Sequence, residues 1–164
     1  MRSIMLWIPH VEYVALRQHG EAAYPHESCG VLLGSPRGHD RLVQRAVPCR
    51  NARTDSPENR YQVDPLDLLR LAREAQTRGE EVVGFYHSHP DHAARWSATD
   101  LAEAHWLGCS YLITRIADGR AEETCSFLLE GYGEDDKRFS EEDLGVLDAA
   151  AEASDLYDVE VTSP

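Results

Sequence analysis

Long hydrophobic runs and secretion signals are absent from this sequence. No apolar stretch approaches the eighteen or so residues of a membrane-spanning helix, and the N-terminus lacks a signal-peptide pattern. With 164 residues and 42% hydrophobic content, the chain is long enough to bury one core, and no internal repeat or linker divides it. We therefore expect a single soluble domain in the cytoplasm, with no membrane partner.

Cysteine is scarce and widely spaced, and several catalytic motifs are missing. The four cysteines contain no C-x-x-C pair, which argues against a zinc ribbon and a redox motif, and we expect free thiols: Cys29, Cys49, Cys109 and Cys125. The sequence also lacks G-x-S-x-G, a P-loop, G-x-G-x-x-G, and the zinc-deaminase pairing of H-x-E with P-C-x-x-C. The familiar serine-hydrolase, nucleotide-binding and deaminase signatures are therefore absent.

Positive charge is sparse toward the C-terminus. The net charge is −13, and residues 118–164 hold 15 acids but only 3 bases, one of which is the chain's single lysine, Lys137. This acidity argues against nucleic-acid binding, which depends on clustered Lys and Arg. We interpret residues 131–164 as an acidic, partly disordered tail with a short helix near Ser140 to Ala151. A solubilising role is the simplest interpretation, and occupation of an active-site cleft is the alternative.

The strongest positive signal is His87-Ser88-His89-Pro90. The preceding run from Glu81 is β-branched and aromatic, so it reads as a buried strand that ends at the histidines. Side chains alternate along a strand, so Val83, Phe85, His87 and His89 should share one face. Both imidazoles could then reach one metal ion, although H-x-H alone is also common in partly buried positions.

A third ligand follows after a loop. Ser97-Ala98-Thr99-Asp100 opens a predicted helix that continues through His105, and Asp100 lies in its first turn. Two histidines and one aspartate leave the fourth position of a tetrahedral zinc open, as in catalytic sites. By itself, however, S-x-x-D is an ordinary capping box, which begins many helices with no metal nearby. The serine could cap the helix and also donate a hydrogen bond to an oxyanion.

A general base is predicted upstream. Glu27 stands at the mouth of a predicted strand, Ser28 to Leu33, whose almost wholly apolar sequence is typical of a strand covered on both faces. This placement would bring Glu27 to the sheet edge where the histidines emerge, and there it could take a proton from water and pass it to a leaving amine. A lone surface glutamate without a role is the competing interpretation.

Taken together, these residues resemble the JAMM (MPN-plus) zinc metalloproteases, whose signature is a glutamate followed by H-x-H, seven residues and S-x-x-D. The resemblance covers about residues 8–130 and implies a Zn²⁺ site at His87, His89 and Asp100, with Glu27 as acid/base and Ser97 as oxyanion donor. Within this family, the sequence resembles the small prokaryotic members that consist of this domain alone.

The remaining elements predict an α/β fold. Helices are expected after Pro9 and from Asp64-Pro65 to Gly79, and further strands at 41–47, 110–116 and 122–129. Helices flanking one sheet favour a single-domain α/β sandwich, and the resemblance implies a mixed, cytidine-deaminase-like (MPN) central sheet. The metalloprotease domain is thus predicted at residues 1–130.

The predicted function is zinc-dependent hydrolysis of an amide bond. The family resemblance implies that the substrate and partner is a small ubiquitin-like or sulfur-carrier protein, cut at its C-terminus as a peptide, isopeptide or cysteine adduct. Two other hypotheses stay open: a non-catalytic MPN-type scaffold, and a metal-dependent amidohydrolase of small molecules. A homodimer is also compatible with the sequence.

Overall fold

The structure is a computed structural model, which describes residues 2–53, 55 and 60–148. In chain order, the strands and helices of this part are β1 Met5–Pro9, α1 His10–Ala23, β2 Cys29–Arg37, β3 Asp40–Cys49, α2 Pro65–Thr77, β4 Glu81–Pro90, α3 Ala98–Glu103, β5 Ser110–Ala117, β6 Arg120–Glu130 and β7 Arg138–Leu147.

The strands form one mixed sheet that closes on itself. Their order is β1-β3-β2-β4-β5-β6-β7, and β7 pairs in parallel with β1 to complete the ring. The pairs β1–β3 and β4–β5 are also parallel, whereas the other neighbours are antiparallel. The predicted α/β class and mixed sheet are confirmed. The predicted sandwich is corrected to a closed, barrel-like sheet, because the pairing of β1 with β7 joins the two edges of the sheet.

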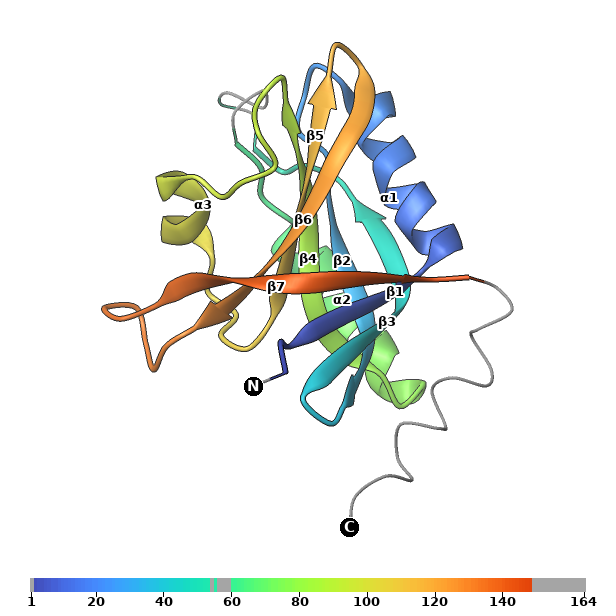
Figure 1. The fold of residues 1–164 in the computed structure, drawn as a ribbon, viewed down its shortest axis with the longest axis vertical. Coiled ribbons are helices and arrows are strands. Elements are labelled where there is room, and N and C mark those ends of the chain that lie inside the picture. The colour runs from blue at the N-terminus through green and yellow to red at the C-terminus, as the bar shows by residue number, and fades with distance from the viewer. Residues whose placement is uncertain (1, 54, 56–59, 149–164) are drawn as a thin grey trace.

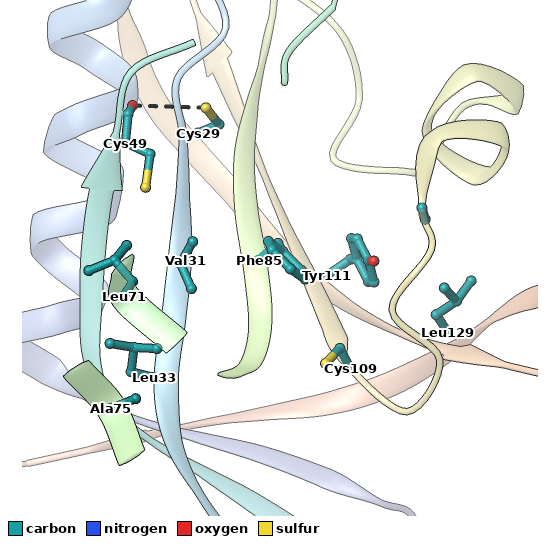
Figure 2. Packing of buried hydrophobic residues seen from close by; sticks show 11 residues of the cluster. Cys29, Val31, Leu33, Cys49, Leu71, Ala75, Phe85, Cys109, Tyr111 and Leu129 are labelled. Carbon is teal, nitrogen blue, oxygen red and sulfur yellow. Dashed lines mark hydrogen bonds between the residues drawn. The ribbon is translucent and has the colours of Figure 1, made fainter. Parts of the chain in front are cut away.

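Apolar side chains cover both faces of the central strands. On one face, Val31, Phe85 and Tyr111 lie opposite one another on β2, β4 and β5 and belong to the same core cluster as Leu71 and Ala75 of α2 (Figure 2). The second core cluster includes Leu16 of α1 together with residues of β1, β2, β4 and β5. Both faces of β2 are therefore buried, as its apolar sequence predicts.

One residue of β4 departs from the predicted alternation. Val83 belongs to the cluster on the α1 side, whereas Phe85 belongs to the cluster on the α2 side. The cause is a register shift, since Leu32 pairs with Gly84 while Leu33 pairs with Val82, so Val83 has no opposite residue on β2. Such a bulge reverses the alternation, and the prediction that Val83 shares a face with Phe85 is wrong.

The predicted tail helix is also wrong in the described residues. Residues 138–147 form β7, and only residues 149–151 of the predicted helix, like the rest of the chain to 164, lie outside the described part. The acidic Glu142 faces inward, where Arg41 contacts its carboxylate at 2.5 Å and the Ser126 hydroxyl donates to it at 2.6 Å. The sheet therefore continues beyond residue 130. An acidic strand can be part of it because Arg41 and Ser126 compensate the inward-facing carboxylate of Glu142.

The helices follow their sequence signals. At the start of α2, the Asp64 carboxylate accepts a hydrogen bond from Leu66 N–H at 2.9 Å and Pro65 occupies the first turn, as predicted. Helix α3 ends at Glu103, two residues before the predicted end, and stands on the opposite side of the sheet from α1 (Figure 1). None of the helices in the described part of the chain is both long and apolar enough to cross a membrane.

Candidate metal centre

Strand β4 carries two buried histidines to the end of the sheet. His87 lies opposite Cys29 of β2 and Ile113 of β5, so strands on both sides fix its backbone. His87 is 2% exposed and His89 is 7% exposed. Their Nε2 atoms lie 3.0 Å apart, which confirms that both rings point to the same place.

Helix α3 brings Asp100 to these imidazoles. Asp100 Oδ1 lies 3.3 Å from His87 Nε2, and its Oδ2 lies 3.2 Å from His89 Nε2. The carboxylate is held by a capping box, in which Ser97 N–H donates to Asp100 Oδ2 at 2.7 Å and Asp100 N–H donates to Ser97 Oγ at 3.1 Å. The same Asp100 carboxylate therefore takes part in the predicted helix cap and serves as the predicted ligand.

Each imidazole is oriented by a second contact. His89 Nδ1–H donates to the carbonyl of Ala93 at 2.9 Å, so in the neutral imidazole Nε2 is the nitrogen that carries the lone pair. The ring of His87 stacks on Tyr61, with centroids 4.2 Å apart and planes at 20°. Among the described residues, His87 Nδ1 is buried and has no hydrogen-bond partner.

The spacing of these atoms fits a tetrahedral zinc ion. Two ligand atoms that each lie about 2.0–2.1 Å from such an ion are about 3.3–3.4 Å apart. The nitrogen–nitrogen and nitrogen–oxygen separations given above lie within a few tenths of an ångström of that value, and the three ligand atoms lie within 4.8 Å of one another. Two imidazole nitrogens and one carboxylate are also a ligand set that suits zinc. The site is therefore compatible with a metal ion.

The electrostatics hold Asp100 and His87 in the states that bind cations, whereas they favour the protonated form of His89 until a cation displaces its proton. Burial alone would raise the pKa of the Asp100 carboxyl, but hydrogen bonds from His87 and His89 lower it below its ordinary value. Burial lowers the pKa of His87, which favours the neutral imidazole. Burial would also lower the pKa of His89, but the contacts with Asp100 and Ala93 outweigh this effect and raise it. An ionised aspartate and a neutral histidine are metal-binding forms.

Glu27 lies at the same end of the sheet and is 5% exposed. It precedes the residues of β2 that pair with β4, and a backbone hydrogen bond from Ser88 N to Ser28 O extends the pairing toward it. Burial raises the pKa of Glu27 to about 8, the charge of His89 lowers it and that of Asp100 raises it. Its Oε2 atom is buried and has no hydrogen-bond partner in the described residues, so this carboxylate is free to accept a proton.

Ser97 is exposed, next to the ligand cluster. Its Oγ accepts the hydrogen bond from Asp100 N–H, so the hydroxyl hydrogen is not used in the cap. Capping therefore leaves one donor available for another acceptor.

A cavity of about 260 Å³ lies beside Tyr61, the ring that stacks on His87. Its lining is largely aromatic and apolar, with Arg53 and Glu103 contributing charge: Arg53, Tyr61, Gln62, Val63, Leu68, Phe85, Glu103, His105, Trp106 and Tyr111. Arg53 forms an ion pair with Glu103 at 3.4 Å, which links the segment before α2 to α3. Tyr61 belongs both to this lining and to the stack on His87, so one ring contacts both the cavity and the ligand cluster.

Tyr61 was not predicted as a site residue, because it directly follows a polar stretch, residues 49–60, that indicates only a loop. Asn51 organises this loop, since its Oδ1 accepts from Arg53 N and Gln62 N at 3.0 Å each and its Nδ2 donates to Arg60 O at 3.0 Å. Asn51 Nδ2 also lies 3.4 Å from the Glu27 carbonyl. No local motif marks these long-range contacts; an aromatic residue in a polar loop is the only signal that could have identified Tyr61.

Comparisons with known proteins agree with the motif. The family described as prokaryotic homologues of the JAB domain matches residues 10–130. A desampylase of Haloferax volcanii is 40% identical over 96 residues, which cover 58% of this chain and 66% of that protein. A probable TtuB-protein conjugate cleaving protease of Thermus thermophilus is 32% identical over 104 residues, covering 63% and 66%. The chain thus spans slightly less than two thirds of either relative.

A solved structure has a similar fold over most of the chain. The solution structure of a protein from Desulfitobacterium hafniense superimposes with a TM-score of 0.74 at 29% identity and covers 88% of this chain and 94% of its own. The family match, the relatives and the recognised H-x-H and S-x-x-D motifs agree. The chain belongs to the prokaryotic homologues of the JAB domain, within the JAMM family.

Proposed function

We propose that this protein is a zinc-dependent peptidase that hydrolyses the amide bond at the C-terminus of a small ubiquitin-like or sulfur-carrier protein. The observation that carries the proposal is the convergence of His87, His89 and Asp100 at zinc-like spacing beside the buried Glu27. The two named relatives support the substrate class, since one is a desampylase and the other is named for cleaving TtuB–protein conjugates.

The three candidate ligands are of the types found in catalytic zinc sites, and three protein ligands leave one coordination position for water or substrate. His87 Nε2, His89 Nε2 and an oxygen of Asp100 would hold the ion. When bound, zinc supplies Lewis acidity, which lowers the pKa of water and polarises a carbonyl group.

Glu27 is the proposed proton carrier. Its buried carboxylate would take a proton from the attacking water and give that proton to the nitrogen of the departing amine. Burial holds its pKa well above the ordinary glutamate value, whereas a cation in the site would favour the ionised form. These opposing effects would place its proton affinity near that required at neutral pH.

Ser97 is the proposed oxyanion donor. The attack of water on a carbonyl places negative charge on the carbonyl oxygen, and a preorganised donor at that position lowers the barrier. The capping box fixes the Ser97 side chain beside Asp100 and leaves its hydroxyl hydrogen free. The residue can therefore cap α3 and stabilise the intermediate at once.

The aromatic cavity supports a polypeptide substrate. It begins at Tyr61, against His87, and Phe85 continues it along β4. Two strand residues span about 6.6 Å, so an extended substrate with its scissile bond at the metal centre would place a residue about two positions away over this cavity. Apolar walls favour binding of an apolar side chain there.

A cleavage assay tests the function. The substrates are a ubiquitin-like carrier ending in Gly-Gly, joined through its C-terminus to a lysine side chain, to a peptide amine or to cysteine. Glu27→Gln should retain one zinc and lose activity by about 10²–10⁴-fold. The exposed Glu81→Gln at the start of β4 is a matched control and should cleave as the unchanged protein does. Cleavage by Glu27→Gln at the unchanged rate would show that Glu27 is not the base.

A further inference from the structure

Lys137 is chemically unusual in this chain, because every other basic side chain apart from histidine is an arginine. It lies in the connection between β6 and β7, and its side chain is 7% exposed although the connection is on the surface. Its ammonium group donates hydrogen bonds to the carbonyls of Ala102 at 3.1 Å and Ala104 at 2.8 Å, and pairs with Glu134 at 2.6 Å. A buried lysine with three oxygen partners indicates a specific structural requirement.

These partners explain the choice of lysine over arginine. An ammonium group has three donor hydrogens around one nitrogen, and here three oxygen atoms surround that nitrogen. A guanidinium group spreads five donors over a flat fork, which suits a carboxylate better than acceptors converging on one point.

Two of the acceptors lie at the C-terminal end of α3. The last carbonyl groups of a helix have no partner within it, and a lysine there both satisfies them and interacts favourably with the helix dipole. Helix α3 has only six residues, too few to be stable without external contacts. Lys137 therefore provides hydrogen-bond partners for the C-terminal end of α3, as the Ser97 capping box does for its N-terminal end.

The connection that carries Lys137 is itself held in place. Asp136 Oδ1 accepts hydrogen bonds from Tyr132 N–H at 2.9 Å and Gly133 N–H at 2.8 Å. Glu134, which pairs with Lys137, also contacts His105 Nδ1 at 2.8 Å, just beyond α3. Residues 131–137 thus form a closed turn that holds the segment after Asp100 at several points.

We propose that Lys137 is a positioning residue for the metal centre: by binding the carbonyls at the end of α3, it fixes the helix whose first turn presents Asp100. Asp100 and Ala104 are four residues apart, so a shift of the helix end is transmitted directly to the carboxylate. This role rests on the proposed zinc site but concerns a residue that is not one of its ligands.

The test measures zinc affinity by competition with a chromophoric chelator, together with the Tm of the metal-free protein. Lys137→Met keeps the length of the side chain and removes its donors, and should weaken zinc binding on the order of tenfold, as loss of an orienting partner does at other metal sites. Lys137→Arg should give an intermediate affinity. The neighbouring Arg138→Met is the matched control. Arg138 contacts Glu130 at 3.5 Å and has no ion pair with α3 in the part of the chain that the structure describes, so this variant should bind zinc as the unchanged protein does.

A role in general stability alone predicts a different result, namely a lower Tm with unchanged zinc affinity in the folded variant, and this outcome would overturn the proposal. If Lys137→Met does not fold, Glu134→Ala decides, because this carboxylate is exposed and its removal takes away the only charged partner among the three that hold the ammonium group. It should weaken zinc binding several-fold, and an unchanged affinity would overturn the proposal. Failure of the unchanged protein to bind zinc would instead refute the metal site, and with it the proposed function.

Discussion

The phenol ring of Tyr61 lies against the imidazole of His87, with ring centroids 4.2 Å apart. Tyr61 comes from the segment between β3 and α2, so the stack joins a loop to the end of β4. It also forms part of the adjoining cavity wall, and one side chain therefore contacts both a candidate ligand and the candidate substrate site.

Removing this ring should weaken the site. An aromatic pair contributes about 0.5–1.5 kcal/mol beyond its buried area, so Tyr61→Leu should lower zinc affinity several-fold and also raise KM. Tyr61→Phe keeps the stack and should retain the zinc affinity of the unchanged protein. Isothermal titration of the metal-free variants checks this. Equal affinities for the Leu and Phe variants would show that the stack does not orient His87.

Substitutions can separate the two proposed roles of Ser97, helix capping and hydrogen-bond donation to the oxyanion. Ser97→Ala should lose about 0.5–2 kcal/mol of stability with the cap, and about 10²–10³-fold in kcat with the oxyanion donor. Ser97→Asp restores a capping side chain without a hydroxyl donor, so it should recover Tm but not kcat. Recovery of kcat by Ser97→Asp would contradict the donor role, and thermal unfolding with steady-state kinetics measures both quantities.

Glu27 should make the stability of the metal-free protein depend on pH. Its pKa is about 8 in the fold, against 4.5 ordinarily, so the folded state retains a proton that the unfolded state loses between these values. Its stabilising contribution is therefore fully present below pH 4.5 and is lost as pH rises through 8. Glu27→Gln should remove this loss. Urea unfolding at pH 5 and pH 9, with metal absent, should show a smaller decrease for Glu27→Gln. An equal decrease would refute the raised pKa.

Closure of the sheet should depend on a buried ion pair. The side chain of Glu142 in β7 is 1% exposed and contacts Arg41 of β3, so Glu142→Ala leaves the largely buried Arg41 without its carboxylate and should cost about 3 kcal/mol. The exposed Glu141, which pairs with Arg95 at 3.0 Å, is the control, and Glu141→Ala should cost about 1 kcal/mol or less. Denaturant unfolding compares the two. Similar losses would mean that β7 is not anchored through Glu142.

The sequence allowed the candidate site to be predicted because its signals are local. The alternation of His87 and His89, the capping box at Ser97 and the apolar run after Glu27 each depend on a few neighbouring residues. The structure brings the three predicted ligands together, although the roles of Glu27 and Ser97 remain predictions.

What was missed depends on partners distant in the chain. Strand β1 has five residues and gains its hydrogen bonds from β3 and β7, while β7 is too acidic to suggest burial until Arg41 neutralises Glu142. The bulge at Val83 arises from pairing with β2, and the contacts of Lys137 join residues more than thirty positions apart. None of these relationships leaves a periodic pattern in the sequence.

Anomalous diffraction at the zinc absorption edge, from crystals of the protein grown with zinc, tests the central claim most directly. We expect one strong peak per chain, about 2.0–2.2 Å from His87 Nε2, His89 Nε2 and an Asp100 oxygen. The absence of a peak at these three residues, or a peak at other residues alone, would contradict the assignment of the metal centre.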